Sequence, residues 1–231
     1  DSIPAIMMPY NPPYYAALIE QAGFTKAKDL LAFKRSKEDA LSERFIKVCE
    51  RCEKRGHLTL RRLNLNHIEQ EAEIIRTIYN KAWAENWGFV PLDKQEMHNI
   101  VKELKPIVRL EGTCVLEVDG VPAGFYICIP NMSHVLQVLC GGLTNPVRLV
   151  RALWTWRHIK DARLLMLGVL PEFRKRGIDL ILIKHIITYG VAVWDWAELS
   201  WVLEDNAGML RGIEECGCHP YKRYRVYQKD L

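Results

Sequence analysis

The first candidate for chemistry is a basic hexapeptide: Arg174, Lys175, Arg176, Gly177, Ile178 and Asp179. A strand pattern precedes it and a helical pattern follows, so we expect the hexapeptide to open a helix. The first amides of a helix have no partner inside the helix and carry partial positive charge, which favours a bound anion. Gly177 would let the backbone approach that anion closely. The pattern predicts a pyrophosphate site; the alternative is a solvated basic surface with Asp179 capping the helix.

Carboxylates on a later strand are the second candidate. The segment 198–204 alternates in polarity, which places Glu198 and Glu204 on one face of a predicted strand. If that face borders a cleft toward the preceding strand at 164–170, either residue can act as a general base, directly or through water. The alternative is that both are ordinary exposed carboxylates. Asn206 follows the strand, where it can also cap the next helix.

The elements that position these residues follow from periodicity, capping and turn residues. Asp119-Gly120 between two β-rich runs predicts a hairpin over 114–129. Helix starts are expected at Asn66 with Glu69 and at Asp93 with Glu96. The other expected elements are strand 58–63, a helical insertion 131–160, strand 164–170, a helix after Gly177, strand 198–203, helix 207–216 and strand 221–227. This order indicates an α/β (α+β) fold with a mixed, mostly antiparallel central sheet flanked by helices.

The beginning of the chain echoes its end. Gly23 and Gly217 are 194 positions apart, and each stands between a short helical pattern and a strand pattern. A charged amphipathic helix follows the first of these segments, and we expect Ser36 and Asp39 to cap it. The expected organisation is a partial repeat at 1–35, a linker helix at 36–56 and the domain proper at 57–231.

Composition narrows the class of protein. The chain has 231 residues, 49% hydrophobic and 26% charged, as in soluble globular domains. Its net charge of +4 is below the basic signature of nucleic-acid binders. No apolar run reaches the roughly 20 residues of a membrane helix. The seven cysteines are scattered through apolar segments, which predicts buried, reduced thiols and no metal site.

The hexapeptide and the order of elements resemble the GCN5-related N-acetyltransferase (GNAT) family. The family's donor-binding motif, Gln/Arg-x-x-Gly-x-Gly/Ala between a strand and a helix, is similar to the segment that begins at Arg174. Members commonly carry an asparagine after the next strand and a Gly-aromatic pair after the following helix, where Asn206 and Gly217-Cys218 stand here. The resemblance covers about Leu58 to Leu231 and implies a GNAT-like acyl-CoA N-acyltransferase fold.

The resemblance also implies a donor and a reaction. Acetyl-CoA or another acyl-CoA would bind as donor substrate without a metal, and an amine would attack its thioester while a backbone N–H near Val169 polarises the carbonyl. The residues implied in donor binding are Leu167, Val169, Arg174, Lys175, Arg176, Gly177, Ile178, Asp179 and Asn206. Glu198 and Glu204 are the candidate bases, and Tyr227 or its neighbour Tyr224 is the candidate proton donor to the thiolate.

Two positions depart from the family pattern. Asp179 stands where the family has glycine or alanine, and a carboxylate facing the ligand would repel phosphate. Ile213 stands where many members carry a tyrosine that protonates the leaving thiolate. Both departures leave room for an alternative, a catalytically silent binder of acyl-CoA or another small ligand.

The sequence-based prediction is therefore an acyl-CoA-dependent N-acyltransferase of the acetyltransferase type. Its acceptor is expected to be a small-molecule or peptide amine of unknown identity. We expect a cytoplasmic protein with no nucleic-acid partner and no membrane partner, and a homodimer remains an option.

Overall fold

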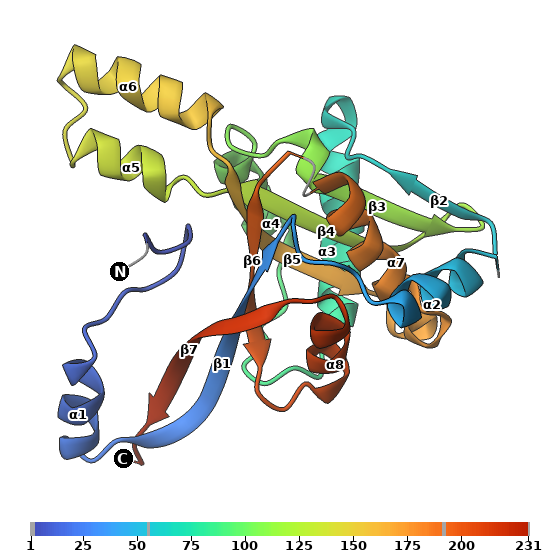
Figure 1. Ribbon diagram of the computed structural model, residues 1–231, viewed down its shortest axis with the longest axis horizontal. Coiled ribbons are helices and arrows are strands. Elements are labelled where there is room, and N and C mark those ends of the chain that lie inside the picture. Colours follow the sequence, from blue (N-terminus) through green and yellow to red (C-terminus); the bar gives the residue numbers. More distant parts are fainter. Residues whose placement is uncertain (1–2, 55, 191–192, 231) are drawn as a thin grey trace.

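Seven strands form one sheet in the computed structural model of the chain (Figure 1). The order across the sheet is β2-β3-β4-β5-β6-β1-β7, and only the β5–β6 pair is parallel among the strand pairs of the described residues, 3–54, 56–190 and 193–230. The strands are β1 (Thr25–Ser36), β2 (Leu58–Arg61), β3 (Thr113–Val118), β4 (Val121–Pro130), β5 (Asp161–Val169), β6 (Trp196–Leu203) and β7 (His219–Gln228). The expected mixed, mostly antiparallel sheet is confirmed.

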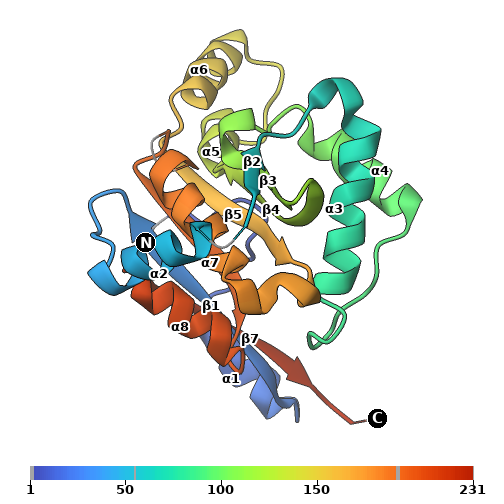
Figure 2. The same ribbon diagram turned by 90° about the vertical axis from the view of Figure 1, so that its right-hand side faces the viewer.

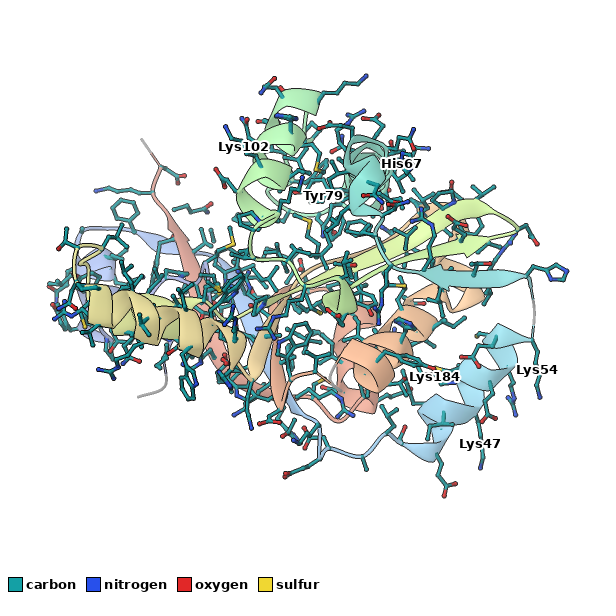
Figure 3. The ribbon with its side chains drawn as sticks, turned by 90° about the horizontal axis from the view of Figure 1, so that it is seen from above. Lys47, Lys54, His67, Tyr79, Lys102 and Lys184 are labelled. Carbon is teal, nitrogen blue, oxygen red and sulfur yellow. The ribbon has the colours of Figure 1, made fainter. Side chains whose placement is uncertain are left out.

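Helices cover both faces of this sheet (Figure 2). One face carries α3 (Ile68–Ala82) and α4 (Lys94–Leu104), and the other carries α2 (Glu43–Glu53), α7 (Ile178–His185) and α8 (Ala207–Glu215). Figure 3 shows the division from above: His67, Tyr79 and Lys102 mark the first layer, whereas Lys47, Lys54 and Lys184 mark the second. The domain is therefore a three-layer α/β arrangement.

Each helical layer buries an apolar stripe against the strands. Ile75 and Ile78 of α3 pack with Phe125 of β4, and all three side chains are at most 5% exposed. On the opposite face, Leu182 of α7 packs with Tyr126 of the same strand. Alternate residues of β4 thus serve the two cores, as the period of two along a strand requires.

Local capping and turn residues fix several element ends where the sequence places them. The Asp93 side chain accepts the Glu96 N–H while the Glu96 carboxylate accepts the Asp93 N–H, so the predicted capping box is confirmed. Asp119 and Gly120 both have left-handed backbone angles, φ 51° and 78°, and join β3 to β4 in the predicted hairpin. These signals act within a few residues, which is why they are legible in sequence.

Two expected helix starts are wrong because a neighbouring cap residue is used instead. The linker helix α2 begins at Glu43, where the Ser42 hydroxyl accepts the Phe45 N–H, whereas Ser36 ends β1. The helix expected to start at Asn66 begins at Ile68, after a short 3₁₀ turn, η1 (Leu65–His67), in which the Asn64 side chain accepts the Asn66 N–H.

The N-terminal segment contributes an interior strand to the sheet. β1 pairs with β6 on one side and with β7 on the other. Helix α1 (Tyr14–Gln21) precedes it, and Gly23 between them is left-handed at φ 84°, as Gly217 between α8 and β7 is at φ 72°. Leu30 and Tyr224, 194 positions apart, lie directly opposite each other. Both echoing segments have the expected helix–glycine–strand order, and the internal repeat itself stays a prediction.

The expected insertion folds into a helical hairpin, α5 (Ser133–Leu139) and α6 (Pro146–Arg157), which projects from the body of the molecule (Figure 1). Asn145 caps α6 by accepting two backbone N–H groups. Across the described residues, no helix combines the length and the hydropathy that crossing a bilayer requires. All seven cysteines are free thiols; six are buried and Cys140 is exposed.

Candidate functional site

The two parallel strands at the centre of the sheet diverge along their length. Their pairing runs from Asp161 opposite Trp196 to Leu164 opposite Leu199. Beyond that point β5 continues to Val169 and β6 to Leu203, and a cavity of about 150 Å³ opens between them. The facing edges of both strands are therefore accessible to a ligand in the gap.

A bulge in β5 accompanies this divergence. On its other edge, Met166 lies opposite Ile127 but Leu164 lies opposite Cys128, so Leu165 is an extra residue on β5. Such an insertion bends a strand and increases its local twist. The extra residue, Leu165, directly follows Leu164, the last residue of β5 that pairs with β6. The bulge therefore accounts for both the bend in β5 and the opening of the cavity.

A larger cavity of about 760 Å³ continues from this gap toward the start of α7. Five of the nine residues predicted to bind a donor line it: Leu167, Val169, Arg174, Asp179 and Asn206. Leu167 and Asn206 also line the gap between the strands, so the two spaces share walls. The structure thus brings these five residues together around one groove.

Gly177, Ile178 and Arg176 are not among the residues that line the groove. Gly177 has φ 74°, and a methyl group added to it would overlap the sulfur of Cys52 on α2, so its lack of a side chain serves helix packing. Ile178 is 2% exposed in the core. The Arg176 guanidinium lies 5.3 Å from the centre of the Phe173 ring, on the surface. Lys175 lies in the 3₁₀ turn before α7, and its side chain is outside the described part of the chain.

Asp179 occupies the first turn of α7. Burial raises the pKa of its carboxyl above the usual range, and the nearby backbone N–H groups of Leu180 and Asp179 oppose the rise. Arg174 opposes this rise through its charge, and its guanidinium donates to the carbonyl oxygen of Ala82 at the end of α3. A carboxyl group and a guanidinium group therefore lie on the wall of the same groove, at or just before the start of α7.

A buried polar network lies beside the point of divergence. Glu198 is fully buried and accepts hydrogen bonds from the Ser200 hydroxyl at 2.6 Å and from the Tyr221 hydroxyl. Arg163 donates to the same Ser200 hydroxyl at 3.2 Å and lies opposite Glu198 on the neighbouring strand. Since Ser200 lines the gap, it connects Glu198 to the cavity.

The other two candidate catalytic residues lie elsewhere. Glu204 pairs with Lys26 at 2.7 Å and accepts the backbone N–H of Asp29, so its carboxylate holds β1 to the end of β6. Tyr227 donates to Glu20 of α1 at 3.0 Å. The structure does not bring Glu204 or Tyr227 to the gap between β5 and β6.

Tyr224 lies nearer the network than Tyr227 does. Burial raises the pKa of Tyr224 to about 12, the negative charge of Glu198 adds to the rise, and the positive charge of Arg163 opposes it. The phenol is therefore protonated at neutral pH. Ile213, at the position where a tyrosine was expected, is 1% exposed in the core.

Sequence reasoning missed the contribution of β1 to the groove. Lys28 lines the cavity, forms an ion pair with Asp205 at 2.7 Å and lies 5.9 Å from the centre of the Trp87 ring. No local pattern indicates this, because the place of β1 depends on a partner strand about 170 residues away. Trp83 and Trp87, in the aromatic segment after α3, complete this wall.

A third space, of about 870 Å³, adjoins the groove on the side of β7. Its walls include Tyr10, Ile19, Trp201 and Tyr224, and mostly apolar groups of the N-terminal segment close it. It shares Trp87 and Leu203 with the groove. A molecule in this space would therefore lie next to one bound in the groove.

Metal ligands do not gather in the described residues: no cluster of three or more His, Cys, Asp or Glu side chains is arranged to hold an ion. Burial raises the pKa of Cys49 to about 11 and that of Cys128 to about 12, so both thiols are protonated at neutral pH.

Comparison with solved structures identifies the fold. A GCN5-related N-acetyltransferase from Sphaerobacter thermophilus superposes on 94% of this chain and 56% of its own, at 14% identity and a TM-score of 0.60. The chain has the GNAT fold. A glucosamine N-acetyltransferase region of a fungal β-N-acetylglucosaminidase (TM-score 0.58, 12% identity, 92% of this chain and 22% of that one) shares the GNAT fold with it. A tandem GNAT protein from the clavulanic acid biosynthesis pathway shares it as well, at a TM-score of 0.53 and 12% identity, over 96% of this chain and 60% of its own.

Two curated proteins are similar in sequence. Protein YghO of Escherichia coli strain K12 is 33% identical over 239 residues, and the bacterial ceramide synthase of Caulobacter vibrioides is 32% identical over 241 residues. Both alignments cover 100% of this chain but only 60% and 62% of the relative. The chain thus spans about three fifths of the length of these relatives. No protein-family model matches it.

Proposed function

We propose that the chain is an acyl-CoA-dependent N-acyltransferase. The observation that carries the proposal is the divergence of β5 from β6 beyond Leu164 and Leu199, which opens a slot continuous with the groove at the start of α7. An extended pantetheine arm can lie along such an edge and accept hydrogen bonds from strand amides. The GNAT fold, whose named members are acetyltransferases, supports this assignment.

The charges along the groove give the donor a direction. Arg174 and Lys28 stand on the groove wall, and Asp179, in the first turn of α7, lines the same space. The phosphorylated end of the donor binds there, and its thioester end lies toward Ser200 at the point of divergence. The donor is therefore oriented with its reacting carbonyl beside the buried network.

The reaction needs a base for the acceptor amine and a proton for the leaving thiolate. Of the two candidate carboxylates, Glu198 has the better position, because Ser200 links it to the slot at 2.6 Å. The amine attacks the thioester carbon, its proton passes through Ser200 toward Glu198, and the carbon–sulfur bond breaks. Tyr224, protonated at neutral pH, is the candidate proton donor to the sulfur, and it lines the space that adjoins the groove. Positioning of two substrates supplies much of the rate in such a site.

For the acceptor we infer a long-chain amine. The space beside the groove is walled mainly by apolar groups such as Tyr10, Ile19 and Trp201, and it suits a hydrocarbon chain better than a charged peptide. One relative is named a bacterial ceramide synthase, and a ceramide is the amide of a long-chain amino alcohol. An amine whose chain fills this space would present its nitrogen near Trp201, which lines both this space and the gap that Ser200 lines.

A free-thiol assay tests the activity. The chain is incubated with acetyl-CoA or a long-chain acyl-CoA and with either a long-chain amino alcohol or a short amine such as ethanolamine. Thiol release is expected with the long-chain amine and should fall at least about tenfold in Ser200→Ala, which breaks the route to Glu198. Release with the short amine alone would overturn the acceptor class, and release with no amine at all would indicate simple hydrolysis.

The rival function is a silent binder of acyl-CoA. Asp179 at the helix start and Ile213 in place of a tyrosine both favour it. Calorimetric binding of acyl-CoA without thiol release for any amine would support the rival, whereas release coupled to amide formation would exclude it.

A further inference from the structure

The outer face of α6 is apolar and uncovered. Val147, Val150, Leu153 and Trp154 follow one another at helical spacing, and each is between 57% and 67% exposed. Four large apolar side chains on one helix face are far more than the scattered exposed apolar residues that soluble surfaces carry. This face, defined by those four residues and called the outer face below, needs a partner.

The inner face of α6 already has its partner. Ala152 is 6% exposed and packs with Val135 of α5 and with Ile159 in a small core of the hairpin. Trp156, also on the inner side, packs against the same core. The outer face is therefore not what holds the hairpin together.

The charge around the outer face has one sign. Residues 120–160 contain no aspartate or glutamate, whereas Arg148, Arg151 and Arg157 stand on α6 and Lys160 follows it. Within the described residues, the three arginines form no ion pair with a carboxylate; Arg148 makes only a weak contact with the Leu139 carbonyl. Asp161 and Asp195 at the base of the hairpin are engaged by His134 and by Lys37 and Lys160.

We propose that the α5–α6 hairpin binds the surface of an anionic lipid bilayer, with the outer face of α6 inserted among the headgroups. A helix with one apolar face and arginines beside it lies in the membrane interface. Arginine stems can bury while their guanidinium groups reach lipid phosphates, and tryptophan prefers the same depth. A nucleic acid would use the arginines but would leave Val150 and Leu153 in water, so the observations favour lipid.

This docking mode does not need a membrane-spanning segment. The expectation of no membrane partner rested on the lack of such a segment, which has no bearing on a helix that lies in the interface plane. In Figure 1 the hairpin lies at the upper left of the view and α1 of the N-terminal segment at the lower left. Tyr10 of that segment lines the apolar space beside the groove.

A vesicle flotation assay with the 231-residue chain tests the proposal. The vesicles are either phosphatidylcholine alone or an equimolar mixture of phosphatidylcholine and phosphatidylglycerol. The chain is expected to float with the anionic vesicles and much less with the neutral ones, and added salt should weaken the binding because it screens the arginines.

Two variants separate the two parts of the surface. One replaces Val150, Leu153 and Trp154 with serine, and the other replaces Arg148, Arg151 and Arg157 with glutamine. Each is expected to lower the partition onto anionic vesicles at least about tenfold, since a basic residue near such a surface contributes roughly fivefold. The matched control replaces Arg44, Lys47 and Arg51 on α2, which removes the same charge from an exposed helix elsewhere, and should float like the wild type.

Equal flotation of all the proteins, or none with anionic vesicles, would overturn the proposal. So would a wild-type dimer in solution that the serine variant converts to monomer, because a second copy would then cover the outer face. Calorimetric titration with coenzyme A is run on the same proteins. A cooperative urea unfolding transition shows that each variant is folded, and the titration reports on the groove independently, so failure here and failure of the proposed enzyme are distinguishable.

Discussion

Asp179 lies in the first turn of α7, beside the amides that a bound phosphate would use. The backbone N–H groups of Leu180 and Asp179 favour the charged form of this carboxylate. The same carboxylate opposes an incoming phosphate. Burial raises its pKa, so protonation during donor binding costs less than for an exposed aspartate.

Replacing Asp179 with asparagine is therefore expected to tighten binding of coenzyme A, by roughly fivefold at neutral pH. In the wild type, affinity should rise as the pH falls and the carboxylate takes up a proton; in Asp179→Asn this contribution is absent. Calorimetric titrations of both proteins between about pH 5 and 8 measure the two affinity profiles. The variant is the control, because its profile contains only the ionisation of the ligand's own phosphates near pH 6. Parallel pH profiles for the two proteins would contradict this role.

The sequence predicted which residue types line the groove, but it did not predict which side chains point into it. Arg174 and Asp179 line the groove as the motif predicts. Arg176 turns to the Phe173 ring instead. The basic residues lie in a 3₁₀ turn, and the geometry of that turn decides which side chain points into the groove. Amino-acid composition does not specify this turn.

At the scale of elements, Gly177 joins the 3₁₀ turn to α7 and lets α7 approach α2. Two constraints act on it: a left-handed backbone at φ 74° and contact with Cys52. Gly88 has almost the same backbone angle, φ 71°, but nothing lies within 4 Å of an added methyl group. Alanine substitutions at Gly177 and Gly88 can therefore separate the cost of a left-handed backbone from the cost of packing against Cys52.

Gly177→Ala is expected to lower the free energy of unfolding by about 1–2 kcal/mol from the backbone and a further 1–3 kcal/mol from overpacking. Gly88→Ala should show the first cost alone. Adding Cys52→Ala to Gly177→Ala should recover part of the second cost. Urea unfolding measures all four proteins, and equal losses for the two glycine variants would show that contact with α2 does not constrain Gly177.

Element starts were predicted where one capping residue has no competitor. Asp93 with Glu96 and Asp119-Gly120 are such cases. Ser36 and Asn66 were wrong because Ser42 and Asn64 offer the same chemistry a few residues away, and tertiary contacts select between them. Ser36 is held at the end of β1 by its pairing with Trp196.

At the scale of the whole molecule, β1 ties the first residues to the last. Asp29 of β1 is 2% exposed and receives two hydrogen bonds from Arg225 of β7, at 2.8 and 3.1 Å. This pairing lowers the pKa of Asp29 to about 2, from an ordinary value of 3.8. The carboxylate therefore binds fewer protons in the folded chain, and its stabilising contribution is present above the ordinary value and is lost as the pH falls through about 2.

Asp29→Asn is expected to remove this acid-dependent contribution, of order 1 to 2 kcal/mol because solvent partly screens the arginine. The stability difference between wild type and variant should narrow as the pH falls from about 5 toward 2. Asp195→Asn, which breaks exposed pairs with Lys37 and Lys160, is the control and should show a much smaller dependence of stability on pH, because solvent screens such pairs. A difference for Asp29→Asn that is constant over this range would contradict the assignment.

The position of β1 is what the sequence could not reveal. The echo between the two ends predicts a helix, a glycine and a strand in each, and both segments have that order. It does not say that one strand pairs with the other, or that β1 separates β7 from β6, because strand partners are chosen by contacts between distant parts of the chain. Lys28 and the apolar space beside β7 depend on that choice and were missed for the same reason.

A calorimetric titration of the chain with coenzyme A tests the central claim, that the groove between β5, β6 and α7 holds a thioester carrier. We expect saturable heat at one site per chain, about tenfold weaker binding in Arg174→Gln, and little change in Arg176→Gln, since only the Arg174 side chain lines the groove. No heat from a folded chain, or equal effects of the two substitutions, would contradict it.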